Sequence, residues 1–131
     1  MAKKSIVLLI YIVAIFLALN LIGILTDRYA QVGVASWYGE EFRGKKTANG
    51  EIYDPDKLTA AHRSLPFGTV VKVTDMSNNR QVIVRINDRG PYKRGRIIDL
   101  SQAAARELGM VKKGLAKVKI KVMPRGKTVA R

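Results

Sequence analysis

A run of 22 residues near the N-terminus, Ser5 to Thr26, contains no charged side chain. As an α-helix it would be about 33 Å long, close to the thickness of the hydrocarbon core of a bilayer. The apolar core of a cleavable signal peptide is usually shorter, about 7–15 residues. A helix that is apolar on every side is also unusual in a soluble domain. We therefore interpret residues 1–26 as an uncleaved membrane anchor, with a long signal peptide as the alternative.

The charges on the two sides of this run predict its orientation. Lys3 and Lys4 precede it and are expected to stay in the cytoplasm, which places the chain from about Asp27 onward outside. The formal charge is +14 and all acidic residues follow Thr26, so 14 − 2 leaves +12 for the exported part. Such a surface attracts polyanions, among them acidic wall polymers and anionic lipid headgroups. We expect no nucleic-acid partner, because that would require a cytoplasmic domain.

The chain contains no cysteine and a single histidine, His62. The missing cysteine excludes a thiolate nucleophile, a disulfide, a zinc–thiolate cluster and a lipidated N-terminal cysteine. One histidine makes a multi-histidine metal site impossible within one chain. We therefore predict no metal and no cofactor.

Most of the exported part is predicted to be β-structure. Four segments have the β-branched or alternating pattern of strands: Val32–Tyr38, Thr69–Thr74, Gln81–Ile86 and Lys117–Val122. The polar tip "DMSNN" predicts a hairpin between the second and third of them. One helix is expected in "QAAARELG", with Ser101 as its N-cap and Gly109 at its end. Residues 39–68 are expected to be long connections.

The stretch "GEEFRGKK", residues 39–46, nearly matches the phosphate-binding pattern G-x-x-x-x-G-K-[ST]. Lys46, however, occupies the position of the hydroxyl that binds magnesium. The next segment contains Asn49, Gly50 and Pro55, which favour turns over the required helix. A nucleotide site is therefore not predicted.

Four carboxylates and the histidine are the candidate catalytic groups: Glu51, Asp54, His62, Asp88 and Asp99. The carboxylates stand beside turns or strand ends, where a barrel brings side chains together. Glycosidic cleavage uses such groups, since a positioned carboxylic acid can protonate the leaving oxygen. Four of the five also have a structural interpretation: Asp99 as a helix cap, Asp88 and Asp54 as turn residues, and His62 as a loop anchor or a hydrogen-bonded core histidine.

Several segments together resemble one known family. They are "ASWYG", "TANGEIYD", "LTAAHRSLPFGTVVKVT", "VRINDRGPY" and "GRIIDLSQAAARELGM". In this order and spacing they are similar to the rare lipoprotein A (RlpA) family of septal-ring lytic transglycosylases, over roughly Val34 to Met123. The resemblance implies an all-β fold, a six-stranded double-psi β-barrel with one or two short helices, which expansins share.

The resemblance also implies a reaction. The substrate would be the glycan strands of peptidoglycan, cut between N-acetylmuramic acid and N-acetylglucosamine to leave a 1,6-anhydro sugar. Asp99 or Asp88 would be the acid/base. Glu51 and His62 would hold substrate and tune the pKa of that aspartate, and Asp54 would support Glu51. Further substrate contacts are expected along the groove from Tyr38, Asn87 and Arg89.

The predicted organisation follows from these segments. It consists of an anchor or signal segment at 1–26, a linker at 27–31, the barrel domain at 32–123 and a basic tail at 124–131. The glycines and lysines of residues 39–46 would form a basic lip beside the glycan groove. We expect a location in the bacterial envelope, outside the cytoplasm, with the division machinery as a possible partner. The alternative function is a non-catalytic, expansin-like module that binds wall polysaccharide.

Overall fold

The structure, a computed structural model, describes residues 2–28, 30–124, 126 and 128–129, without the side chains of 24–28. The chain divides into two compact units, Met1–Ala30 and Gln31–Arg131. Each unit is described by itself below. Half of the predicted basic tail, residues 125, 127, 130 and 131, lies outside the described residues.

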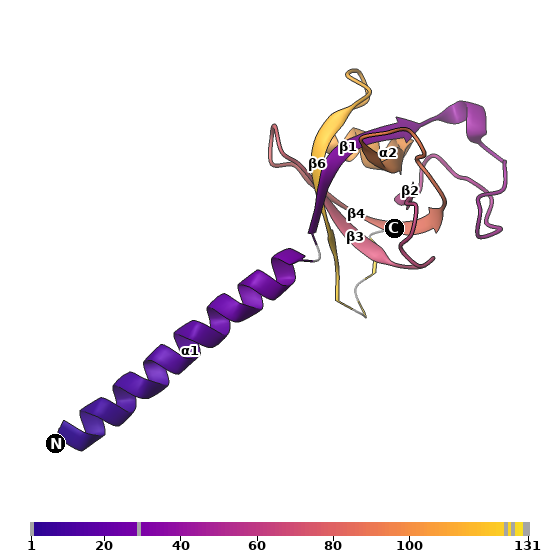
Figure 1. The fold of residues 1–131 in the computed structure, drawn as a ribbon. Coiled ribbons are helices and arrows are strands. Elements are labelled where there is room, and N and C mark those ends of the chain that lie inside the picture. The colour runs from indigo at the N-terminus through magenta and orange to yellow at the C-terminus, as the bar shows by residue number, and fades with distance from the viewer. Residues whose placement is uncertain (1, 29, 125, 127, 130–131) are drawn as a thin grey trace. The chain divides into compact units, whose positions relative to one another are not determined.

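The first unit contains helix α1, Ala2–Arg28 (Figure 1). Its part Ala2–Gly23 is long and apolar enough to cross a membrane, and none of that part is buried within the protein. This helix fits a signal or anchor segment, as the uncharged run predicts.

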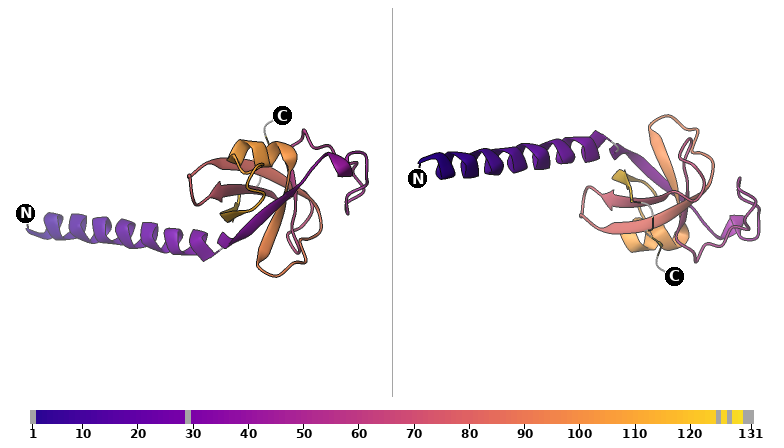
Figure 2. Two further views of the ribbon diagram at one scale, coloured as in Figure 1. Left: turned by 90° about the horizontal axis from the view of Figure 1, so that it is seen from above. Right: turned by 90° about the horizontal axis from the view of Figure 1, so that it is seen from below.

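The second unit is a closed barrel of six strands (Figures 1 and 2). The strands are β1 (Ala30–Tyr38), β2 (Thr59–Ala61), β3 (Val70–Asp75), β4 (Gln81–Asp88), β5 (Arg96–Ser101) and β6 (Ala116–Val122). Their order around the barrel is β1-β5-β2-β4-β3-β6. The predicted all-β, six-stranded barrel is confirmed.

The barrel contains both parallel and antiparallel strand pairs. Strand β1 runs parallel to β5, and β2 runs parallel to β4, whereas β2 and β5 are antiparallel. Strands β3 and β4 form the predicted antiparallel hairpin, and β6 pairs with the other edge of β3. The short strand β2 therefore lies between β5 and β4, the two strands that carry Asp99 and Asp88.

The four strands predicted from sequence correspond to β1, β3, β4 and β6. The expectation of connections throughout residues 39–68 is wrong in two places, the 3₁₀ helix η1 (Glu40–Phe42) and strand β2. Strand β2 has only three residues, "TAA", all of them buried. Its strand conformation comes from pairing with two neighbours, which the propensities of threonine and alanine do not reveal.

Helix α2, Gln102–Leu108, has the caps that the sequence predicts. The Ser101 hydroxyl accepts a hydrogen bond from the backbone N–H of Ala104 at 3.3 Å, and Gly109 takes a left-handed φ of 70°. Asp99 does not cap this helix, because it lies within β5. Figure 2 shows α2 against the barrel, where Ala104, Ala105 and Leu108 join the apolar core.

Candidate active site

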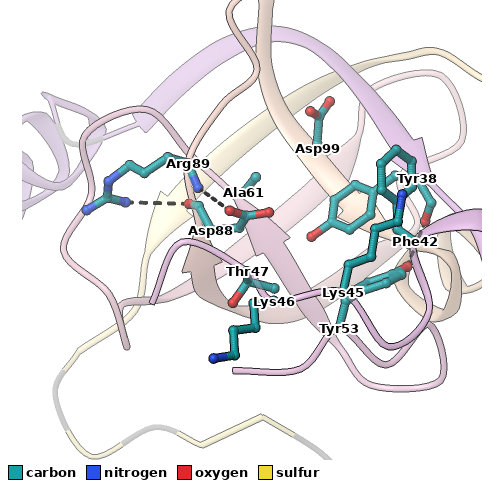
Figure 3. A pocket seen from close by; sticks show the side chains of 10 residues that line it. All are labelled: Tyr38, Phe42, Lys45, Lys46, Thr47, Tyr53, Ala61, Asp88, Arg89 and Asp99. Atoms are coloured by element: carbon teal, nitrogen blue, oxygen red, sulfur yellow. Dashed lines mark hydrogen bonds between the residues drawn. The ribbon is translucent and has the colours of Figure 1, made fainter. Parts of the chain in front are cut away.

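A pocket of about 190 Å³ opens where β1, β2 and β4 end (Figure 3). Ten residues line it: Tyr38, Phe42, Lys45, Lys46, Thr47, Tyr53, Ala61, Asp88, Arg89 and Asp99. Of the eight site residues predicted from sequence, four line this pocket: Tyr38, Asp88, Arg89 and Asp99. The other four, Glu51, Asp54, His62 and Asn87, lie outside it.

Ala61 stands between the two aspartates. It pairs with Asp99 across the antiparallel β2–β5 ladder and with Asp88 across the parallel β2–β4 ladder. Adjacent strands are about 4.8 Å apart, so the backbones that carry the aspartates are roughly 10 Å apart. The small alanine side chain leaves the space between the two carboxylates open.

Asp99 lies in a partly buried position beside the hydroxyl of Ser36. The strand register places Ser36 directly opposite Asp99, and the Ser36 hydroxyl donates to its Oδ1. Burial raises the pKa of the Asp99 carboxyl; the Ser36 hydrogen bond and Arg96 oppose this, and the charge of Asp88 adds to it. The net direction is upward, which keeps Asp99 protonated to a higher pH than an exposed aspartate.

The turn after β4 brings the chain next to Asp99. Gly90 has a φ of 118°, a conformation that side chains other than glycine rarely adopt, and it precedes a cis bond to Pro91. A Cβ atom at this position would lie 3.9 Å from Asp99 Oδ2. Glycine therefore allows this turn to border the carboxylate.

Asp88 is oriented by backbone N–H groups. Its Oδ1 accepts from the N–H of Arg89 and from that of Ala48, both at 2.9 Å. The bond from Ala48 ties the end of β4 to the loop at residues 47–51. The other oxygen, Oδ2, has no hydrogen-bond partner among the residues that the structure describes, and the carboxylate faces the pocket (Figure 3).

Glu51 is held by a charged neighbour outside the pocket. Its carboxylate oxygens accept hydrogen bonds from the two terminal guanidinium nitrogens of Arg85, at 2.5 and 2.8 Å. They also accept from the side-chain amides of Asn49 and Asn87. The Arg85 hydrogen bonds dominate and lower the pKa of Glu51 to about 2. Glu51 is therefore ionised at neutral pH and is no proton donor. Glu51 and Asp54 line a second, separate pocket together with Arg85. Asp54 accepts from the backbone N–H of Asp56, as a turn opener does.

His62 is buried and anchors a loop. Its Nδ1 accepts from the backbone N–H groups of Ser64 and Leu65, both at 3.1 Å, so the ring proton belongs on Nε2. Nε2 lies 3.0 Å from Oε1 of Gln31 and donates to it. Burial, followed by the charges of Arg63 and Arg89, lowers the pKa of His62.

Arg89 and Asn87 use their polar groups within the protein. The Arg89 guanidinium donates to the carbonyls of Leu65 (2.9 Å) and His62 (3.2 Å) and lies 3.9 Å from the centroid of the Phe67 ring. Asn87 is 2% exposed and donates to Glu51. Both side chains hold the loops that surround the pocket.

Tyr38 forms one wall of the pocket. Its ring packs against Tyr53 and Phe42, with ring centroids 4.5 and 5.8 Å away. The pKa of the Tyr38 hydroxyl is raised, mainly by burial and then by the charge of Asp88. The hydroxyl is therefore protonated throughout the physiological range.

The profile of one protein family, described as lytic transglycolase, matches residues 30–120. The chain belongs to this family.

Curated relatives agree with the RlpA resemblance. The endolytic peptidoglycan transglycosylase RlpA of Campylobacter jejuni is 56% identical over 91 residues, and that of Helicobacter pylori is 58% identical over 98. These matches cover 70% and 75% of this chain, but only 33% and 31% of the relatives. The chain thus spans about a third of their length.

Solved structures share the fold of this lytic transglycolase domain. Apo expansin of Clavibacter michiganensis superposes with a TM-score of 0.60 at 22% identity, covering 76% of this chain and 52% of that one. The Streptomyces papain inhibitor superposes with a TM-score of 0.59 at 24% identity, covering 72% and 94%. At these identities the likeness establishes the barrel alone.

The pocket and the residues in contact with it include side chains that the sequence motifs did not single out. Ser36, Thr47, Tyr53 and Ala61 contribute through strand register and loop packing, for which the sequence has no local signal. Lys45 and Lys46 do line the pocket, as the predicted basic lip requires. Among the described residues, no group of three or more His, Asp or Glu side chains is placed to hold a metal ion.

Proposed function

We propose that this protein is a peptidoglycan lytic transglycosylase that cuts between N-acetylmuramic acid and N-acetylglucosamine. The observation that carries the proposal is the pair Asp88 and Asp99, which flank Ala61 in one pocket. Family membership supports it, because the curated relatives that share this domain are named endolytic peptidoglycan transglycosylases. Those of Campylobacter jejuni and Helicobacter pylori are 56% and 58% identical to this chain over the matched regions.

Asp99 is the proposed acid/base. Its proton passes to the bridging oxygen, the bond from that oxygen to C1 of the muramoyl sugar breaks, and N-acetylglucosamine leaves with a free hydroxyl. The Asp99 carboxylate then takes the proton of the muramoyl 6-hydroxyl, whose oxygen bonds to C1. Asp99 is protonated again and no water is consumed, so one group in two protonation states completes the reaction.

Asp88 is proposed to stabilise the positive charge that develops on the sugar ring. A carboxylate on the far side of Ala61 is placed to do this without receiving the proton. The assignment of Asp99 as the acid rests on its raised pKa, since a proton donor must hold its proton at the working pH. Glu51, Asp54, His62, Asn87 and Arg89 are proposed to act indirectly, by positioning the loops around the two aspartates.

The proposed location is the bacterial envelope. Helix α1 would anchor the protein in the membrane or act as its export signal, with the barrel outside the cytoplasm, where peptidoglycan lies. The proposed organisation is an anchor at 1–26, a linker at 27–31, the barrel domain at 32–123 and a tail at 124–131. The proposed partners are the glycan strands of peptidoglycan and a protein of the division machinery.

The test is a product analysis with purified sacculi. The full chain in detergent is expected to release muropeptides that end in the 1,6-anhydro sugar, detected by mass spectrometry. Asp99→Asn and Asp88→Asn should each lower the initial rate about 100-fold or more, the usual effect of losing an acid/base or charge-stabilising group. Asp56→Asn is the matched control, because Asp56 is 60% exposed and lies outside the pocket.

Other outcomes of this test favour other functions. Products without the anhydro sugar would indicate hydrolysis. No products, together with salt-sensitive pelleting on sacculi that survives both aspartate substitutions, would indicate the wall-binding module instead.

A further inference from the structure

The hydroxyl of Tyr38 is a buried polar group without a partner. Four buried side-chain atoms among the described residues have no hydrogen-bond partner: Tyr38 Oη, Thr59 Oγ1, Asn87 Oδ1 and Gln102 Oε1. Tyr38 alone among these four residues lines the pocket with Asp88 and Asp99. A buried donor without a partner destabilises the folded state, so folded proteins rarely retain one without a use.

The ring that carries this hydroxyl is fixed. It packs between Tyr53 and Phe42, at centroid distances of 4.5 and 5.8 Å. The backbone of the same residue is also held, because the carbonyl of Tyr38 accepts from the Tyr53 hydroxyl at 2.7 Å and Tyr38 pairs with Ser101 of β5. The hydroxyl therefore cannot easily turn toward another protein group. Because its oxygen is buried in the free protein, the side chains around it must shift slightly for a ligand oxygen to reach it.

The hydroxyl faces the space between the two aspartates. Figure 3 shows it pointing into the pocket, toward the same space as the carboxylates of Asp88 and Asp99. Burial and these carboxylates raise the pKa of the Tyr38 hydroxyl, so it keeps its proton and can donate. The Asp88 carboxylate disfavours an anionic ligand at this point. The acceptor that fits is an uncharged oxygen.

We infer that the Tyr38 hydroxyl is the hydrogen-bond donor that the site offers to an uncharged oxygen of the sugar bound between Asp88 and Asp99. The inference rests on the proposed function for the identity of that ligand, since a hexosamine ring presents hydroxyl and acetamido oxygens in this space. Tyr38 is thus a substrate-contacting residue whose partner is missing in the free protein. Binding of the glycan satisfies the donor that folding leaves unpaired.

Tyr38→Phe tests this directly, because it removes the oxygen and keeps the ring. With soluble glycan strands below saturation, the rate of anhydro-product formation by the full chain should fall about tenfold, the equivalent of one neutral hydrogen bond. The melting temperature should stay equal to the parent's or rise, because the variant loses only an unpaired polar atom. A hydroxyl with a structural partner would show the opposite change in stability.

Tyr53→Phe is the matched control. The Tyr53 hydroxyl donates to the Tyr38 carbonyl at 2.7 Å and accepts from the backbone N–H of Gln102 at 3.3 Å. Its removal should lower the melting temperature, since the Tyr38 carbonyl and the Gln102 N–H each lose a hydrogen-bond partner. The two variants remove the same atom from neighbouring rings, so opposite changes in stability separate the unpaired hydroxyl from the paired one.

Each outcome decides the inference. A slower reaction with unchanged or higher melting temperature supports it. Unchanged activity in Tyr38→Phe, or a melting temperature that falls as in Tyr53→Phe, overturns it while leaving the proposed reaction intact. If the parent chain forms no anhydro product, the proposed function fails, and binding of the same glycan strands replaces the rate as the readout. Weaker binding by Tyr38→Phe then supports the inference, and equal binding overturns it.

Discussion

Asp88 and Asp99 are the same residue type in one pocket, yet their surroundings differ. Backbone N–H groups orient Asp88, whereas Asp99 is partly buried beside one hydroxyl. The difference supports the two roles proposed for these aspartates, a proton donor for Asp99 and a charge-stabilising group for Asp88. Glu51 shows the opposite extreme, a carboxylate that its arginine partner keeps ionised.

The pH dependence of the reaction should report Asp99. Because its pKa is raised, the protonated form persists to a higher pH, and the rate should fall as pH rises through that pKa. The Ser36 hydrogen bond lowers this pKa, so Ser36→Ala should move the alkaline limb of the rate profile to higher pH. The measurement is the initial rate against pH for both proteins. An alkaline limb that stays in place in Ser36→Ala would argue against Asp99 as the acid.

Replacing Glu51 should affect stability in a defined pH window. The folded-state pKa of Glu51 is lowered from 4.5 to about 2, so its contribution is complete above pH 4.5 and is lost as pH falls toward 2. Both partners are more than a third exposed, which limits that contribution to about 1 kcal/mol. Glu51→Gln should therefore be less stable than the parent at pH 7 in urea unfolding.

The matched comparison for this prediction is the same pair of proteins near pH 2. There about half of the Glu51 side chains in the folded parent are protonated, so the difference between the two unfolding curves should be much smaller than at pH 7. A constant difference in stability from pH 7 to pH 2 would mean that the Glu51 charge is not its cause.

At the scale of elements, three residues of β2 determine how the site is assembled. Strand β2 pairs in parallel with β4 and antiparallel with β5, so Ala61 adjoins Asp88 on one side and Asp99 on the other. The loop that follows β2 is held in turn by His62 and Arg89. Packing of these connections, rather than a catalytic motif, brings the carboxylates to one pocket.

Acid should loosen the loop that follows β2. Burial lowers the pKa of His62, so the stability from its neutral ring is complete above pH 6.5 and declines as pH falls toward the lowered pKa. Protonated Nδ1 cannot accept from Ser64 and Leu65, so their amides should exchange with solvent faster as pH falls below 6.5, after correction for intrinsic exchange rates. The hairpin amides of Val73 and Val82 serve as the internal control, since they have no contact with His62. Equal protection of the loop amides across this range would contradict the conclusion that His62 holds this loop.

At the scale of the whole molecule, the chain combines an apolar helix with a basic barrel. The helix has the length and composition of a membrane span, and the net charge of +14 lies almost entirely in the rest of the chain. A surface of this sign is attracted to the anionic polymers of an envelope. Anchoring would restrict the proposed reaction to peptidoglycan within reach of the membrane.

A charge in the middle of the span should disrupt anchoring. An arginine at the centre of a membrane helix is unfavourable by about 2.5–3.5 kcal/mol on insertion scales, so Ile12→Arg should shift the protein toward the fraction released by alkaline carbonate. Ile12→Leu is the matched control and should stay in the membrane pellet. If the mass of the mature parent protein shows that the N-terminal residues have been removed, the segment is a cleaved signal instead.

The sequence by itself determined the features that depend on neighbouring residues. The uncharged run determines helix α1, alternation marks β3, β4 and β6, and Ser101 with Gly109 bounds α2, because each follows from side chains a few positions apart. Linked motifs added the family and its barrel, both confirmed.

Only the tertiary structure decided which of the candidate site residues lie together. Asp88 and Asp99 share a pocket, whereas Glu51 pairs with Arg85 and His62 binds its own loop. That choice depends on strand register and on the three-residue strand β2, whose contacts are between residues far apart in the chain, and no local pattern encodes them.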